Sequence, residues 1–176
     1  MIMPTLTLEL VEGTHTIRLE KDGYFPLEFT ITVEEGKTYD IHKELIPTNA
    51  FTVVSITLDK EQPRVGEIVK ATITVKNNTN DTRDCQVKLY VGTTLINTVD
   101  ITSVAPNSTK NADITFTAPE SDTTVKAEVY TDVYGELKKT DEKSISLAIK
   151  VTVMVTISSE PTGARVYVDG EYKGTT

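Results

Sequence analysis

The sequence predicts an all-β protein, and three observations support this fold class. Thr, Val and Ile make up 63 of the 176 residues (30, 19 and 14), and these β-branched side chains favour a pleated sheet over a helix. Apolar and polar residues alternate along most of the chain, which is typical of half-buried strands. Gly, Pro, Asn and Asp cluster between the alternating runs, as expected of turns.

The N-terminal region contains four short alternating runs. Leu6, Leu8 and Leu10 occupy one face of the first predicted strand. The other three strands are expected at residues 14–20, 25–33 and 39–45. Glycine-containing turns separate the first three runs.

The pattern restarts after a linker at residues 46–50, whose proline and asparagine suit a connection between domains. Seven further strands are predicted, at residues 51–58, 67–77, 84–91, 95–101, 108–118, 123–131 and 143–149. Seven short strands over about 100 residues, with turn signals between them, are typical of an Ig-like β-sandwich.

The C-terminal region alternates again. Val151, Val153, Val155 and Ile157 form the apolar face of its first predicted strand. Two more strand pieces, residues 164–168 and 171–172, flank an Asp-Gly pair, which is a strong hairpin signal.

Two motifs give the ends of the chain a family resemblance. Residues 158–176 contain Pro161-Thr162-Gly163-Ala164 and resemble the opening half of a PEGA domain, a small β module of prokaryotic surface proteins. The closing half resembles the other end of this chain. Its matching residues are Pro4, Leu6-Thr7-Leu8, Gly13-Thr14-His15 and Gly23-Tyr24.

The central part resembles the CARDB family of Ig-like modules, which is associated with cell adhesion. The supporting residues are Pro63 and Gly66, Ile73-Thr74-Val75-Lys76-Asn77, and Thr117-Ala118-Pro119. The resemblance implies three regions: residues 1–46 as the C-terminal part of a PEGA-like domain, 47–150 as the sandwich, and 151–176 as the N-terminal part of a PEGA-like domain. The expected fold is therefore an Ig-like β-sandwich plus a small PEGA-type β domain in a circularly permuted or strand-swapped arrangement.

Two arrangements reconcile the reversed order of the PEGA halves. Either the two ends of one chain meet, or each C-terminal end completes the N-terminal end of another chain. A seven-stranded sandwich starts at one pole and finishes at the other, about 30 Å away for strands of about 9 residues. Because the linkers are short, we favour completion between chains by strand addition. The candidate assembly strands carry Val151, Val153, Val155, Ile157, Ala164, Val166 and Val168 on one side and Leu6, Leu8, Leu10, Ile17 and Leu19 on the other.

The family resemblance implies a non-enzymatic structural module of an extracellular or cell-surface protein, archaeal in origin. We expect a stalk, adhesin or filament repeat, with an S-layer as one possible setting. Its partner is itself, as a head-to-tail homo-oligomer or a covalent repeat array. The sequence is interpreted as a fragment without its own signal peptide. The alternative function is a glycan-binding or cell-wall-binding module appended to an exported enzyme. Its exposed aromatic residues would be Tyr130, Tyr134 and Tyr172.

Charge and composition argue against several other functions. With a net charge of -8 and no Lys/Arg cluster, the chain is not expected to bind nucleic acid. It has no apolar run near the ~20 residues of a membrane span. Cys85 is expected to be a half-buried strand residue, and neither His15 nor His42 lies in a catalytic motif. No catalytic, cofactor or metal site is predicted.

Two features of the predicted loops concern possible ligands or modifications. The loop at residues 77–84 is rich in Asn and Asp, and it is interpreted as a hairpin loop rather than a calcium site because it lacks the spacing of a calcium loop. Three Asn-x-Ser/Thr sequons lie in predicted turns and are candidates for N-glycosylation, at Asn77, Asn80 and Asn107.

Overall fold

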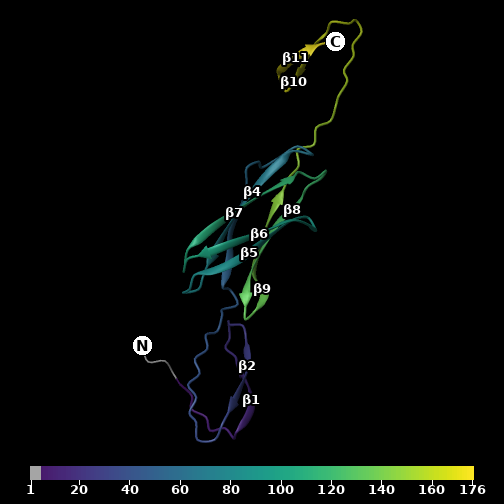
Figure 1. The fold of residues 1–176 in the computed structure, drawn as a ribbon. Coiled ribbons are helices and arrows are strands. Elements are labelled where there is room, and N and C mark those ends of the chain that lie inside the picture. The colour runs from purple at the N-terminus through teal and green to yellow at the C-terminus, as the bar shows by residue number, and fades with distance from the viewer. Residues whose placement is uncertain (1–4) are drawn as a thin grey trace.

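The computed structural model describes residues 5–176, and these residues form strands, turns and extended segments without a helix. Figure 1 shows three parts in a row, with a central sandwich between an N-terminal and a C-terminal hairpin. The predicted all-β class with an Ig-like sandwich is confirmed. No helix in the described residues is long and apolar enough to cross a membrane.

The sandwich contains seven antiparallel strands in two sheets. The strands are β3 (Phe51–Leu58), β4 (Ile68–Asn77), β5 (Arg83–Val91), β6 (Thr94–Val104), β7 (Thr109–Thr117), β8 (Thr123–Val133) and β9 (Glu136–Leu147). One sheet has the order β3-β4-β7 and the other β6-β5-β8-β9. All seven predicted strands of this region are present.

Strand β9 begins seven residues earlier than the alternation predicts. Its first half pairs with β8, where Glu136 lies opposite Val133 and Asp141 opposite Val129. Residues 136–142 carry one apolar side chain, Leu137, so the sequence gives no strand signal there. An edge strand can form from such residues because pairing on one side satisfies its backbone while polar side chains face water.

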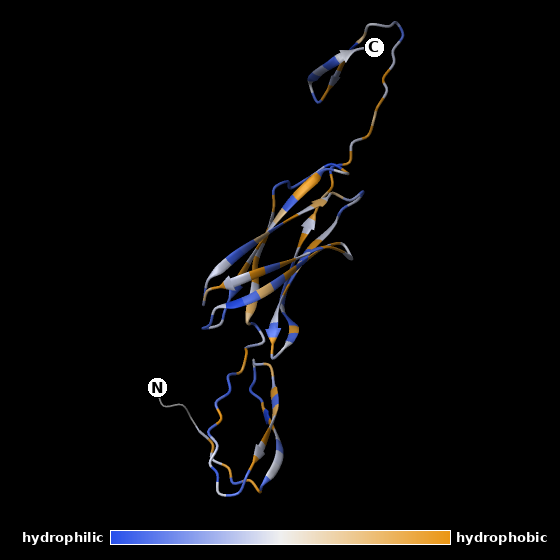
Figure 2. Ribbon diagram, viewed as in Figure 1, coloured by the Kyte–Doolittle hydropathy of each residue, from blue (hydrophilic) through white to orange (hydrophobic). Residues whose placement is uncertain are grey.

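The hydrophobic core lies between the two sheets. Phe51, Ile73, Leu89, Ile114 and Leu147 are its largest buried apolar side chains, and they come from five different strands. Figure 2 shows hydrophobic residues distributed along the strands of both sheets. The apolar residues of the alternating pattern therefore point into this core, as expected of two sheets that are each buried on one face.

Two hairpins flank the sandwich. The N-terminal hairpin pairs β1 (Gly13–Leu19) with β2 (Leu27–Val33), and the C-terminal hairpin pairs β10 (Arg165–Val168) with β11 (Glu171–Thr175). The strands predicted at residues 6–10, 39–45 and 151–157 do not form, so these three predictions are wrong for the single chain. A strand needs a neighbour to satisfy its backbone, and no strand pairs with these segments in the described residues.

Candidate assembly surfaces at the two ends

Large apolar side chains are exposed mainly outside the sandwich. We call residues 5–46 the head and residues 151–176 the tail. Among the described residues, fourteen of the twenty exposed large hydrophobic side chains lie in these two regions. In the head they are Leu6, Leu8, Leu10, Val11, Tyr39 and Ile41; in the tail they are Val151, Val153, Met154, Val155, Ile157, Tyr167, Val168 and Tyr172.

The head presents one apolar face built by the β1-β2 hairpin. In the register of the hairpin, Ile17 lies opposite Phe29 and Leu19 opposite Leu27. Residues directly opposite each other share a face, so these side chains form one surface, and all four are only half-buried. The leucine-rich segment at residues 6–10 adds exposed apolar side chains to the head, because Leu6 is 81% exposed and Leu8 61% exposed.

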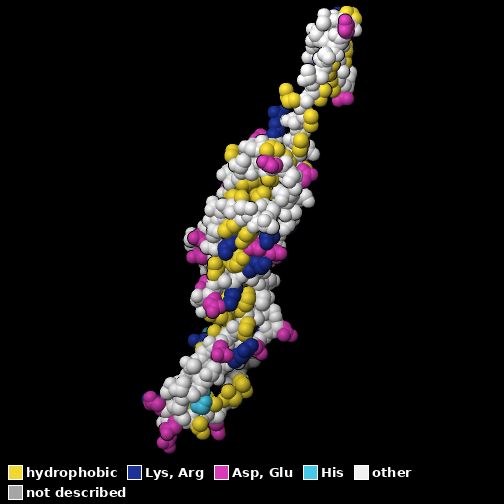
Figure 3. All heavy atoms as spheres, turned by 90° about the vertical axis from the view of Figure 1, so that its right-hand side faces the viewer, with side chains coloured by type: hydrophobic (Ala, Val, Ile, Leu, Met, Phe, Trp, Pro, Cys, Tyr) yellow, Lys and Arg dark blue, Asp and Glu magenta, His cyan; other side chains and the backbone are white. Residues whose placement is uncertain are grey.

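The tail begins with an extended segment that makes no strand. Val153 is 79% exposed and Val155 74% exposed, although the alternation suits a half-buried strand. Figure 3 shows hydrophobic side chains along the narrow neck that leads from the sandwich to the C-terminal hairpin. The sequence pattern of these residues is that of a strand with one buried face, but their side chains are exposed and their backbone pairs with no other strand.

The hairpin of the tail closes on itself. The Gly163 amide donates to the Thr176 carbonyl at 2.8 Å, and the Thr176 amide donates to the Ala164 carbonyl at 3.1 Å. The rings of Tyr167 and Tyr172 pack edge to face with centroids 5.6 Å apart. A two-stranded hairpin of this size has no core of its own, since three or more strands or a packed helix are needed for independent stability.

The head and the tail differ in how they join the sandwich. The Phe25 amide donates to the Ile46 carbonyl at 2.8 Å, and the Ile46 amide donates to the Tyr134 hydroxyl at 3.0 Å. Tyr134 lies in the β8-β9 turn with φ of 56°, so the turn reaches the buried Ile46 at the junction with the head. Sequence reasoning placed Tyr134 among possible ligand-binding aromatics and missed this role at the joint.

The chain is bonded to the sandwich at Lys150, the residue that precedes the tail. The Lys150 amide donates to the Pro63 carbonyl at 2.8 Å, and Lys150 forms an isolated parallel bridge with Arg64. Beyond Lys150, no hydrogen bond or salt bridge within the described residues links the tail to another part of the chain. The tail is therefore free to pair elsewhere.

Tyr130 and Tyr172 are the other two aromatic residues that a glycan-binding module would use, and they lie in different parts of the molecule. Tyr130 faces outward from β8, where Lys88 Nζ lies 4.3 Å from its ring centroid and its hydroxyl donates to Glu128 at 2.7 Å. Tyr172 belongs to the hairpin of the tail. The three tyrosines do not form one line of exposed rings on a single sheet.

Glu128 is a buried carboxylate on the outer face of a sheet. Only 6% of the residue is exposed, and Lys126 donates to one carboxylate oxygen while Tyr130 donates to the other, both at 2.7 Å. Burial raises the pKa of Glu128, but these two hydrogen bonds and the nearby charges outweigh it and lower the pKa to about 2. Burial and the bond to Glu128 raise the pKa of Tyr130 to about 12. The carboxylate of Glu128 is therefore ionised at neutral pH, and both of its oxygens accept hydrogen bonds from neighbouring side chains.

The sequence predicts Asn77 in an accessible turn, but it is the last residue of β4 and is buried. Asn77 is fully buried, and its amide donates to the carbonyls of Asp81 at 2.7 Å and Val104 at 2.9 Å. Its side-chain oxygen accepts bonds from the amide and the hydroxyl of Thr79. A glycan cannot be attached to this side chain in the folded protein. Asn80 and Asn107 are exposed in loops, and their modification stays a prediction.

The histidines and Cys85 have ordinary surroundings. His15 Nε2 lies 2.8 Å from the Val11 carbonyl oxygen, and His42 is exposed in an extended segment. Cys85 is buried in β5, more deeply than the half-buried position expected, and burial raises the pKa of its thiol to about 12. Its thiol is therefore protonated at neutral pH.

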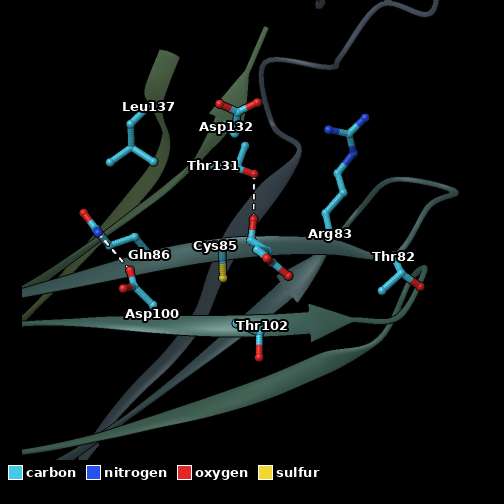
Figure 4. A pocket seen from close by; sticks show the side chains of 10 residues that line it. Thr82, Arg83, Cys85, Gln86, Asp100, Thr102, Thr131, Asp132 and Leu137 are labelled. Atoms are coloured by element: carbon cyan, nitrogen blue, oxygen red, sulfur yellow. Dashed lines mark hydrogen bonds between the residues drawn. The ribbon is translucent and has the colours of Figure 1, made fainter. Parts of the chain in front are cut away.

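Figure 4 shows a hollow in the sandwich surface, beside the start of β5 and the end of β6. Three carboxylates line it, and each accepts a hydrogen bond from the protein: Asp84 from the Ser103 amide, Asp100 from the Gln86 side chain and Asp132 from the Gly135 amide. In residues 5–176, no group of three metal-ligating side chains converges.

Comparisons with known proteins divide the chain in the same order. The CARDB family model matches residues 48–144, and the PEGA domain model matches residues 4–49 and 152–176, split between the two ends. No curated protein sequence matches the chain.

Solved structures resemble the chain at low identity. The CARDB domain of a Pyrococcus furiosus protein, crystallised in complex with di-metal ions, is 14% identical over 57% of this chain and 90% of its own, with a TM-score of 0.43. Spo0M, a sporulation control protein from Bacillus subtilis, is 19% identical over 58% of this chain and 50% of its own, with a TM-score of 0.39. A solution structure from Arabidopsis thaliana is 13% identical over 68% of this chain and 95% of its own, with a TM-score of 0.42.

Proposed function

This chain belongs to the CARDB family and carries a PEGA domain split over its two ends, and from this premise we propose that it is a non-enzymatic structural module that assembles head to tail. Domains of both families suggest an extracellular or surface module. The finer proposal is a stalk, adhesin or filament repeat whose partner is a second copy of the same chain or the next repeat of a longer one.

The observation that carries the proposal is the match between two incomplete surfaces. The tail offers an extended segment with Val153 and Val155 exposed and unpaired. The head offers the half-buried apolar face of β1 and β2 and the exposed leucines of residues 6–10. Adding a strand to an exposed sheet supplies ladder hydrogen bonds and buries alternate side chains together. Each end therefore provides what the other lacks.

The position of the ends supports pairing between chains rather than within one chain. Figure 1 shows the head and the tail at opposite ends of the sandwich. The head is held there through Tyr134, and the tail leaves the sandwich at Lys150. To meet inside one chain, one of them would have to detach and travel the length of the sandwich.

Such a contact is heterologous, because a head surface meets a tail surface rather than its own copy. Heterologous contacts produce open arrays unless the rotation between units closes a ring. In a longer chain with several repeats, the tail of one repeat would continue directly into the head of the next. The two halves would then pair within one covalent chain, and the array would act as a spacer.

The test is to mix residues 1–150 with a peptide of residues 151–176 and measure binding by calorimetry. We expect a one-to-one complex. A peptide with Val153→Asp and Val155→Asp, which places charges on the apolar face, should not bind. The matched control changes Thr152→Asp and Thr156→Asp on the opposite face and should retain most of the binding. If residues 1–150 stay monomeric and do not bind the unmodified peptide, strand completion is wrong.

A further inference from the structure

The first and last strands of the sandwich, β3 and β9, run side by side in different sheets and in the same direction. Three contacts establish this: Phe51 meets Thr140, Val53 meets Asp141, and Val54 meets Lys143. The residue numbers rise together on both strands, so the strands are parallel. They are also the strands through which the chain enters and leaves the sandwich.

The contacts between these strands are hydrogen bonds from side chains to the backbone. Thr140 Oγ1 donates to the Phe51 carbonyl at 2.9 Å, and Lys143 Nζ donates to the Val54 carbonyl at 2.8 Å. Between them, the Val53 amide donates to Asp141 Oδ2 at 2.8 Å. Two of the three bonds involve a charged group, and such bonds are stronger than neutral ones.

Irregularities in both strands aim these groups at each other. The register of β3 with β4 shifts between Val53 and Ser55, which leaves Val54 as the extra residue. The register of β9 with β8 shifts at Thr140 in the same way, because Val129 pairs with Asp141 and Tyr130 with Lys139. A bulge frees backbone groups from the ladder and redirects side chains, so both bulges supply the bonding partners.

Tension on the chain would load all three bonds at once. The head and the tail lie at opposite ends of the sandwich (Figure 1), so a pull along the chain draws β3 toward the head and β9 toward the tail. Because the strands are parallel, they would slide past each other, and the three bonds would be sheared together. Strands pulled apart from one end would instead lose their bonds one after another.

We propose that β3 and β9 form a mechanical clamp, in which Thr140, Asp141 and Lys143 hold the backbone of β3 against shear when the chain is stretched. The clamp rests on the proposed function, since it matters only in a module that bears tension. It adds to that function a load-bearing element and the residues that form it.

The test is single-molecule force spectroscopy on the full chain, held through two introduced cysteines. Asn49→Cys and Lys150→Cys are at exposed positions beside the start of β3 and the end of β9, so this pair pulls the clamp in shear. Cys85 is buried and its thiol protonated, so it does not compete for the handles. In a second chain, Asn49→Cys and Glu136→Cys pull from one end of the two strands and open them in sequence.

Shear should require a clearly higher unfolding force than opening from one end. At constant force in shear, Asp141→Ala should raise the unfolding rate about tenfold, as expected for loss of a charge-assisted hydrogen bond. Thr140→Val should raise it about threefold, in line with a neutral hydrogen bond. Forced unfolding reports the unfolding rate, so it detects contacts that break before the barrier.

The matched control is Thr72→Val. Thr72 Oγ1 donates to Asp113 at 2.6 Å across β4 and β7, within one sheet and away from the clamp. This variant should leave the unfolding rate in shear within about twofold. Equal forces in the two pulling geometries, or equal effects of Thr140→Val and Thr72→Val, would overturn the clamp. Because single chains are measured, failure of this test leaves head-to-tail assembly standing, and failure of assembly leaves this test unaffected.

Discussion

The sandwich and the two ends of the chain differ in whether their sheet edges are covered. In the sandwich, side chains bridge the open sides between the sheets: Lys143 reaches the Val54 carbonyl on one side, and Lys110 reaches the Thr102 carbonyl at 2.7 Å on the other. In the head and the tail, apolar side chains stand exposed beside segments that form no strand. An exposed apolar edge invites pairing with another chain, so natural proteins usually protect it. Side chains bridge the sheet edges of the sandwich, whereas the apolar side chains of the two ends are exposed.

The largest expected effect contrasts one core residue with one tail residue. Leu89→Ala removes a fully buried side chain and should lower the free energy of unfolding by about 2–5 kcal/mol. Val153→Ala should change it by less than about 0.5 kcal/mol, because this side chain is 79% exposed. Urea denaturation of dilute protein measures both. A comparable loss from Val153→Ala would mean that the tail packs within its own chain.

Acid should destabilise the sandwich through Glu128. Because the folded state lowers the pKa of this group to about 2, its contribution is present at neutral pH and is lost as the pH falls from its ordinary pKa toward 2. The loss should be on the order of 2–3 kcal/mol over this range. Denaturation curves at several pH values measure it. Glu128→Gln should flatten this part of the pH profile, and an unchanged profile would contradict the assignment.

The next prediction compares the stability cost of replacing the buried sequon asparagine with that of replacing an exposed one. Asn77→Ala removes a side chain that bonds two carbonyls and the Thr79 hydroxyl, and it should cost about 1–3 kcal/mol. Asn80→Ala, three residues along the same loop, should stay within about 0.5 kcal/mol. Thermal unfolding of the two variants makes the comparison. Equal melting temperatures would show that Asn77 does not hold the loop.

The smallest expected effect concerns the joint between the head and the sandwich. Tyr134→Phe removes the hydroxyl that accepts from the Ile46 amide, and the cost should be about 1 kcal/mol. Hydrogen exchange of the Ile46 amide should become about fivefold faster, because the joint opens locally. Tyr172→Phe, in the unattached tail, should leave this rate unchanged. If neither variant alters the rate, Tyr134 does not hold the joint.

The sequence predicts the sandwich well because every second residue along most of its strands is apolar and is buried between the two sheets. All seven strands follow from it, except for the polar first half of β9, where pairing with β8 alone forms the strand. The same alternation fails at residues 6–10, 39–45 and 151–157, because a pattern shows which face can be buried and not whether a partner is present. Two of these segments, residues 6–10 and 151–157, are candidate assembly segments.

Buried polar residues were the least predictable part of the molecule. Asn77 carries a sequon in an apparent turn, and only the three-dimensional contacts reveal that its amide lies inside the protein. Glu128 occupies an outward position in the alternation of β8, and it is covered there by the side chains of its own neighbours. Tyr134 acts across 88 residues of sequence, a distance that no local pattern reports.

The central claim is that the two ends of the chain complete one another between molecules. Its most direct test is the mass of the full chain in solution, measured by analytical ultracentrifugation over a wide range of concentrations. We predict species larger than the 19.4 kDa monomer that grow in length as the concentration rises. A mass that stays at 19.4 kDa at every concentration would contradict head-to-tail completion.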